Sequence, residues 1–200
     1  WSLDKKGTLT ISGKGEMPDY SGDTPPWVKY RDDIKAVVIE EGVTHIGAQC
    51  FQFCTKLKSV TIPSSVESIG DAAFYRCEKL SAVTLPDALT EIADQTFDHC
   101  TALKSIVIPD GVTRIGESAF NCCSVLKTVD IPASVEKICD SAFNACQKLE
   151  TVYYGGTASD WNKIEIERYN KRLTSAELVI ADTETSAPAP SEKPVGGKLK

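Results

Sequence analysis

The sequence predicts an α/β repeat solenoid, in which each repeat contributes one short strand and one short helix or turn. Three observations predict this fold. The middle of the chain repeats every 23 residues without insertion or deletion. Several columns of equivalent positions are apolar in every repeat. Of the 200 residues, 42% are hydrophobic and 25% are charged, which is enough apolar material for a continuous core.

Residues 1–38 are predicted to form an N-terminal cap. Apolar and polar residues alternate on both sides of a turn at residues 4–7, which predicts a β-hairpin. A short helix is expected to follow, with Thr24 as its N-cap and Pro25 at its first position. A solenoid needs such a cap because its end would otherwise expose the apolar core.

Residues 39–153 are predicted to be five repeats of 23 residues each. A unit of this size cannot bury its own apolar face, so each side chain must pack against its equivalent in the next repeat. Two of the constant columns are Phe51, Phe74, Phe97, Phe120 and Phe143, and Cys54, Cys77, Cys100, Cys123 and Cys146.

Each repeat is expected to begin with a strand and to return through a short helix. Val83 and Leu85 alternate with outward residues, as in a strand, and a proline then ends it. Further along, the positions i, i+4, i+5 and i+8 are apolar, which is the stripe of one or two helical turns: Ile115, Ala119, Phe120 and Cys123.

Residues 154–180 are predicted to be the C-terminal cap. Thr157 and Asp160 have the spacing of a capping box at the start of a helix. All three tryptophans lie in the two caps, where we interpret them as sealing the core rather than stacking on a ligand. Residues 181–200 are rich in proline and polar residues and are expected to be an extended linker or tail.

The repeat pattern L-x-x-V/I-x-I/L-P followed by I-x4-F-x2-C-x2-L resembles the BspA-like class of bacterial leucine-rich repeats. The resemblance covers about residues 1–166. It departs from the pattern where Cys139 and Ala93 replace a glycine and Glu40 replaces a proline. It implies a right-handed leucine-rich repeat superhelix, and a bacterial protein with a role in adhesion or recognition at the cell surface.

The composition argues against several functions. The net charge is −6 and no cluster of lysine and arginine stands out, so nucleic acid is not an expected partner. No apolar run is long enough to cross a bilayer. His45 and His99 lie in different columns and are interpreted as solvated surface residues. We therefore expect no catalytic, cofactor or metal site, and no enzyme activity.

The cysteine column has two interpretations. Neighbouring coils are close enough for disulfides, yet five equivalent cysteines cannot all pair among themselves, and cysteine fills a small apolar position well. We expect free, buried thiols. Cys122 lies in a different column, with Arg76 and His99, and is expected to be exposed and reactive.

Specificity is expected at the outward strand positions where the repeats differ. Solenoids usually bind on the concave strand face. The candidate interaction surface consists of Thr61, Thr84, Val107, Asp130 and Tyr153, together with Lys58, Lys104 and Lys127. Phe53 and Tyr75, on the other side, offer an alternative surface.

We expect a monomeric, extracellular or cell-surface module that binds a protein or a glycoconjugate. The alternative is an accessory or spacer domain of a larger secreted enzyme. Trp1 already has the pattern of a strand, so the sequence is expected to start after a leader or inside a longer polypeptide.

Overall fold

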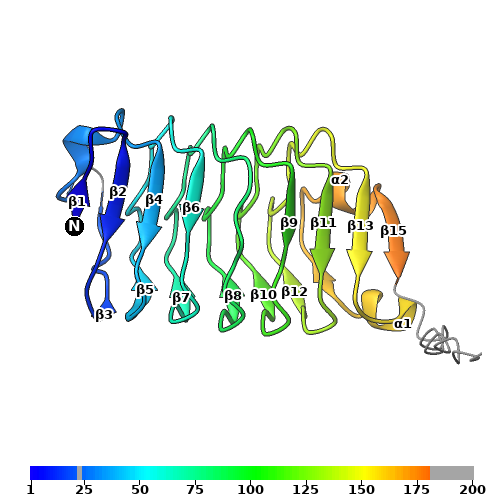
Figure 1. Ribbon diagram of the computed structural model, residues 1–200. Coiled ribbons are helices and arrows are strands. Elements are labelled where there is room, and N and C mark those ends of the chain that lie inside the picture. Colours follow the sequence, from blue (N-terminus) through cyan, green and yellow to red (C-terminus); the bar gives the residue numbers. More distant parts are fainter. Residues whose placement is uncertain (22–23, 181–200) are drawn as a thin grey trace, which may run out of the picture.

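The computed structural model describes residues 1–21 and 24–180, which form a solenoid of stacked coils (Figure 1). The described part of the chain contains no helix long and apolar enough to cross a membrane. The strands of the long face are β1 (Ser2–Leu3), β2 (Thr8–Ile11), β4 (Ala36–Ile39), β6 (Ser59–Thr61), β9 (Ser105–Val107), β11 (Thr128–Ile131), β13 (Thr151–Tyr154) and β15 (Glu177–Ile180). A second row contains β3 (Gly15–Glu16), β5 (Val43–Ile46), β7 (Ser68–Ile69), β8 (Glu91–Ile92), β10 (Arg114–Ile115), β12 (Lys137–Ile138) and β14 (Glu165–Ile166).

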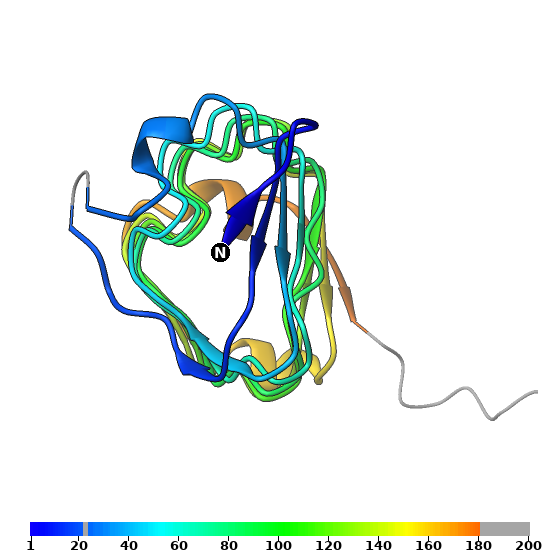
Figure 2. The ribbon, with the colours of Figure 1, turned by 60° about the vertical axis from the view of Figure 1, so that its left-hand side comes forward.

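Each row consists of two sheets, β1-β2-β4-β6 and β9-β11-β13-β15 in the long face, and β3-β5-β7 and β8-β10-β12-β14 in the second row. Within each sheet the strands pair in parallel, apart from the antiparallel hairpin of β1 and β2. Arg114 pairs with Lys137 and Thr128 with Thr151, so the register advances by 23 residues from coil to coil. The repeat length of the sequence is therefore confirmed as one coil. Viewed nearly along the stack, the coils superimpose, with the long sheet on one side (Figure 2).

Of the short helix or turn expected in each repeat, the structure has the turn and not the helix. Ser118 and Cys122 both have left-handed backbone angles, with φ of 55° and 58°, which an α-helix cannot contain. Backbone N–H groups here alternate between bonds within the turn and bonds to the next coil. Phe97, for example, donates to the Ala119 carbonyl at 2.8 Å. The aliphatic column read as the start of the helix instead forms the second row of strands.

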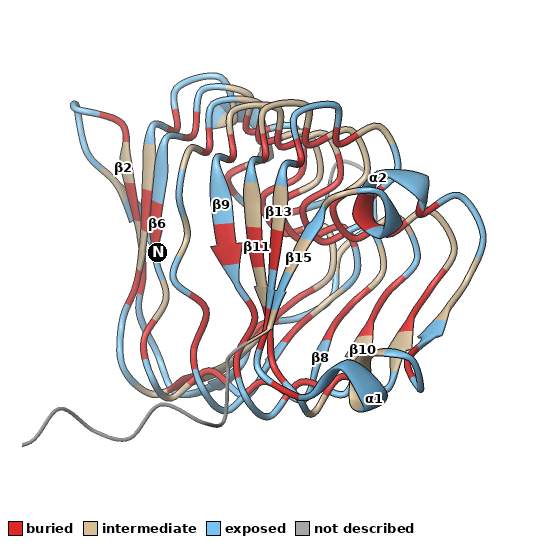
Figure 3. Ribbon diagram, turned by 90° about the vertical axis from the view of Figure 1, so that its right-hand side faces the viewer, coloured by how far each residue is buried: buried red, intermediate tan, exposed pale blue. Residues whose placement is uncertain are grey.

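The phenylalanine column is a continuous stack of buried rings. Phe51, Phe74, Phe97, Phe120 and Phe143 are all fully buried. Their ring centroids lie between 5.2 and 5.5 Å apart from one coil to the next. Trp27 extends the stack at the N-terminal end, 5.7 Å from Phe51. Figure 3 shows how the buried residues of successive coils line the interior.

The cysteine column consists of free thiols, as expected. All eight cysteines are free, and those of the column are buried. Each thiol from Cys77 onward donates to a backbone carbonyl of the preceding coil. Cys100 Sγ, for example, lies 3.4 Å from the Phe74 oxygen. Burial raises the pKa of Cys54 and Cys146 to about 12, so these thiols stay protonated.

A thiol count distinguishes this arrangement from a disulfide ladder. We expect an Ellman-type reagent to label all eight cysteines in denaturant. In the native chain it should label only Cys122 readily, because the other seven are buried. If two or more of the eight cysteines failed to react in denaturant without reductant, they would be in disulfides, and the column of free thiols would be contradicted.

One predicted strand is missing from the long sheet. Residues 81–86 form no strand, so β6 and β9 are not bridged by a strand of the coil between them. The hydrogen bonds beside the gap are long, at 3.5 Å from Ser81 N to Lys58 O and 3.4 Å from Lys104 N to Ser81 O.

The two ends of the solenoid differ. At the N-terminal end, a 3-10 helix spans Val28–Tyr30 and starts after Trp27, rather than at Pro25 with Thr24 as its cap. The Trp27 ring is buried, whereas Trp1 is half exposed and contacts it edge-on at 6.0 Å. Trp1 therefore shields the end of the core only in part.

At the C-terminal end, α1 (Ala158–Trp161) carries the capping box of Thr157 and Asp160, and α2 (Lys171–Thr174) follows β14. Strands β14 and β15 extend both rows, so much of this segment builds one more coil. The linker expected at residues 181–200 lies outside the described residues.

Candidate functional site

The exposed face of the long sheet carries the predicted interaction residues. Val107 in β9, Asp130 in β11 and Tyr153 in β13 are neighbours in the parallel register. Thr61 is exposed in β6, and Thr84 is exposed in the interrupted segment between β6 and β9. The structure thus brings three variable positions side by side and leaves the two threonines farther along the face.

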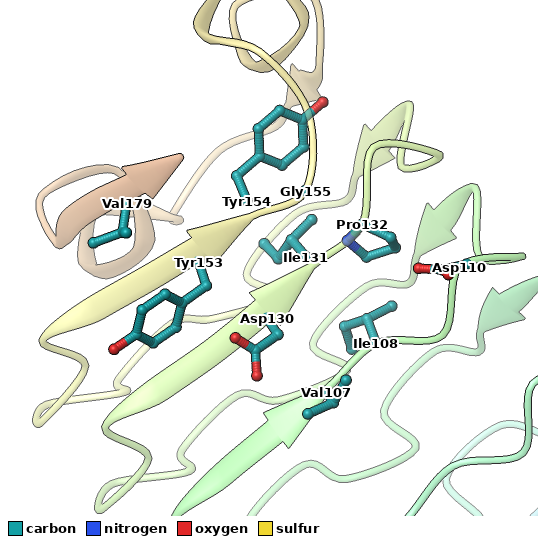
Figure 4. A pocket seen from close by; sticks show the side chains of 10 residues that line it. All are labelled: Val107, Ile108, Asp110, Asp130, Ile131, Pro132, Tyr153, Tyr154, Gly155 and Val179. Carbon is teal, nitrogen blue, oxygen red and sulfur yellow. The ribbon is translucent and has the colours of Figure 1, made fainter. Parts of the chain in front are cut away.

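These three positions border a shallow hollow of about 280 Å³ near the ends of the last four strands of the long sheet (Figure 4). Val179 of β15 pairs with Tyr153 and completes the row. The hollow is lined by Val107, Ile108, Asp110, Asp130, Ile131, Pro132, Tyr153, Tyr154, Gly155 and Val179. We call the row of Val107, Asp130, Tyr153 and Val179 the strand-face row.

The strand-face row is more apolar than an exposed strand position requires. The exposed fractions of Val107, Tyr153 and Val179 are 62%, 44% and 36%. Scattered single apolar residues are normal on a protein surface, but these three surround one hollow on neighbouring strands. Their apolar surface remains available to a partner.

Asp130 is the charged member of the row. Its carboxylate has no hydrogen-bond or ion-pair partner among the residues that the structure describes. Burial between its neighbours raises the pKa of this carboxyl above its usual value. The charge therefore costs the folded state some stability, and a hydrogen-bond donor or cation on a ligand would offset that cost.

We expect Asp130→Asn to leave the free energy of unfolding at neutral pH unchanged or slightly higher. A carboxyl whose pKa is raised by folding stabilises the fold below its unfolded pKa and loses that contribution as the pH rises through its folded pKa. Urea unfolding at neutral pH and at about pH 3.5 measures the difference. It should shrink on acidification, and a clear destabilisation at neutral pH would show that Asp130 has a structural role.

The lysine column lies apart from the hollow. Lys58, Lys104 and Lys127 are exposed and come just before the strands of the long sheet, whereas the hollow lies toward the strand ends. The lysines line up across coils, since Lys127 N donates to Lys104 O at 2.9 Å. The predicted surface therefore contains two separate parts, an apolar and acidic row and a basic edge.

Val179 is a site residue that the sequence analysis missed. It lies in the segment interpreted as a cap, outside the 23-residue register, because 26 residues separate it from Tyr153. The available signal in the sequence was the short apolar run of Leu178, Val179 and Ile180, and in the structure exposed and half-buried residues alternate along it.

The sequence predicts that both histidines are solvated surface residues, but in the structure each imidazole contacts other side chains. His45 contacts Ser68 Oγ at 2.7 Å and Asp19 Oδ1 at 3.2 Å. His99 Nδ1 lies 2.7 Å from Asp98 Oδ1. The partners of His45 come from other coils, which the linear sequence does not reveal, whereas Asp98 directly precedes His99 and the turn brings its carboxylate onto the imidazole.

The repeats decide the family. The model for the BspA type leucine rich repeat region matches residues 29–150 in six copies. This chain belongs to the BspA-type leucine-rich repeat family. No curated protein matches the chain significantly.

Solved structures of bacterial leucine-rich repeat proteins resemble the chain. A leucine rich cell surface protein from Faecalibacterium prausnitzii A2-165 is 41% identical over 66% of this chain, with a TM-score of 0.64. A leucine-rich repeat protein from Eubacterium ventriosum is 35% identical over 79% of the chain, with a TM-score of 0.69. The chain spans only 35% and 41% of the lengths of these two proteins.

The fold extends to more distant proteins. A leucine-rich repeat protein of T. pallidum matches 89% of this chain and 88% of its own, with 22% identity and a TM-score of 0.66. At this identity the likeness shows the fold alone. The chain is thus a solenoid of a family whose solved relatives include a bacterial cell-surface protein.

The BspA-type repeats also expose an aromatic corner on the turn side. The Phe53 and Tyr75 rings meet edge-on at 5.3 Å, and Phe53 is 36% exposed. The guanidinium of Arg76 lies 6.0 Å from the Phe53 ring and donates to the Tyr75 hydroxyl at 3.2 Å. These aromatic groups already have partners within the chain, unlike the strand-face row.

Proposed function

We propose that this chain is a non-catalytic recognition module of a bacterial cell-surface or secreted protein. It binds a protein or glycoconjugate ligand through the exposed face of the long sheet, and it acts as a monomer. The observation that carries the proposal is the strand-face row, where three exposed apolar side chains surround a carboxylate without a partner in the described chain.

Two further observations support the proposal. The constant columns of the repeat are buried, so they stabilise the solenoid and are not available to a ligand. A solved neighbour is described as a cell surface protein, and this chain matches about a third of its length. A surface location and a place within a longer protein follow from that likeness as parts of the proposal.

Tyr153 and Val107 provide the test. The wild-type chain and the double variant Val107→Ser/Tyr153→Ser are applied to the same array of immobilised glycans and extracellular proteins. We expect at least one ligand whose binding falls about tenfold or more in the variant, as for the loss of an aromatic binding residue. Tyr169→Ser is the matched control, because Tyr169 is 65% exposed and lies away from the row.

Retained binding in the double variant would place the ligand elsewhere on the solenoid. If the wild-type chain binds nothing specifically, the accessory or spacer role in a larger secreted protein becomes the better explanation. Circular dichroism of each variant verifies that the repeats remain folded.

A further inference from the structure

Three metal-ligating side chains meet on the turn side, away from the strand-face row. They belong to Asp98, His99 and Cys122, and one donor atom from each lies within 4.8 Å of the other two. No other group of three such residues with this spacing is found in residues 1–21 and 24–180. The cluster combines three ligand types, namely a carboxylate, an imidazole and a thiol.

The repeat geometry builds the cluster. His99 and Cys122 occupy the same position in consecutive coils, and both have left-handed backbone angles, with φ of 60° and 58°. Their backbones are fixed by bonds to the next coil, from His99 N to Asn121 O at 2.8 Å and from Cys122 N to Asn144 O at 2.9 Å. Both side chains therefore leave rigid, equivalent positions about one coil spacing apart, which is about 4.8 Å.

Asp98 fixes the orientation of the His99 imidazole. Its side chain is only 8% exposed, and its Oδ1 accepts hydrogen bonds from His99 Nδ1 at 2.7 Å and from Asn121 Nδ2 at 3.0 Å. The His99 side chain is 31% exposed and Cys122 is half-buried, so solvent reaches the cluster.

A nucleophilic thiol explains the cluster less well. The Cys122 thiol donates to the Asn121 side-chain oxygen at 3.6 Å rather than to His99, whereas a nucleophilic cysteine needs a base within hydrogen-bond reach. A metal ion, by contrast, removes the thiol proton on binding and compensates the negative charge that Asp98 brings.

We propose that Asp98, His99 and Cys122 bind a thiophilic divalent transition-metal ion of the zinc class. Sulfur, imidazole nitrogen and carboxylate oxygen are ligands that zinc accepts together, with a fourth position left for water or a partner's ligand. The ion replaces the proton between His99 Nδ1 and Asp98 Oδ1. Those atoms then separate from 2.7 Å to about 3.3 Å, the edge of a tetrahedron with bonds of about 2.0 Å.

Cobalt(II) is the probe, because it absorbs visibly in tetrahedral sites and gives a near-ultraviolet charge-transfer band when a thiolate is bound. Titration of the full, reduced chain should give both signals with saturation at one equivalent, and zinc should abolish them by displacement. Cys122→Ser should remove the charge-transfer band. His99→Gln and Asp98→Asn should each weaken cobalt binding by about tenfold or more.

Two variants serve as matched controls. His45→Gln removes the other histidine of the chain, which also contacts an aspartate. Cys139→Ala changes a cysteine in a column that already accepts alanine at residue 93. Both should keep the cobalt spectrum and the stoichiometry of the wild type.

A second measurement needs no variant. Zinc at saturation should slow the alkylation of Cys122 in the native chain by at least about tenfold, as followed by mass spectrometry of its peptide. The absence of a charge-transfer band, a band that persists in folded Cys122→Ser, or alkylation of Cys122 that zinc does not slow would each overturn the proposed site.

Discussion

Replacing Phe97 by alanine is expected to lower the free energy of unfolding by about 3 to 5 kcal/mol. Phe97 is fully buried at the middle of the ring stack, with neighbouring rings 5.5 Å away on both sides. The cavity would be held open by the backbone bonds that join the coils, so the core could not collapse into it. Urea unfolding followed by circular dichroism measures the change.

Phe53→Ala is the matched control, because this phenylalanine lies at the surface and is 36% exposed. Its removal loses contacts with the Tyr75 ring and with two arginines, and should cost less than about 1 kcal/mol. Equal losses for the two variants would contradict the buried stack as the source of stability.

The second large effect is expected from Asn170→Ala, which should lower the free energy of unfolding by about 1 to 3 kcal/mol. In the inner coils, the phenylalanine N–H donates to a backbone carbonyl of the next coil, as from Phe120 to Ala142. At the last phenylalanine this acceptor is a side chain, since Phe143 N donates to Asn170 Oδ1 at 2.9 Å. The amide nitrogen of the buried Asn170 also donates to Cys139 O at 2.8 Å.

Alanine at residue 170 would leave the Phe143 N–H buried without its partner, whereas the Cys139 carbonyl would keep its hydrogen bond from Ala142 N at 3.2 Å. Asn144→Ala is the matched control, because the Asn144 side chain is exposed and makes one hydrogen bond, to Asn121 at 3.1 Å. It should cost less than about 1 kcal/mol. If Asn170→Ala also cost less than about 1 kcal/mol, water would replace Asn170 as the acceptor for the Phe143 N–H, and the Asn170 amide would not be needed to stabilise the last coil.

The sequence predicts those parts of the fold that repeat. Phe97 and Cys100 recur at a fixed spacing because each packs on its equivalents in the neighbouring coils, and such a column is visible in a single sequence. The same logic failed for the turn side. Ile115, Ala119 and Cys123 have helical spacing. The left-handed angles of Ser118 and Cys122, however, belong to residue types with no special preference for them.

The sites depend on features that do not repeat. Val179 joins the strand-face row from a coil that is longer than the others, so the 23-residue register does not align it with Tyr153. His99 and Cys122 were visible as one column, but the buried Asp98 beside them was not, because only the coil geometry turns it toward the imidazole. Sequence periodicity locates packing positions better than it locates binding groups.

The central claim is that a ligand binds the exposed face of the long sheet, and amide NMR tests it most directly. The isotopically labelled chain is titrated with a ligand identified on the array, and the shifted amides are mapped. The account predicts that the largest shifts cluster at residues 107, 130, 153 and 179. Shifts centred instead on the Phe53 and Tyr75 corner, with the long sheet unchanged, would contradict it.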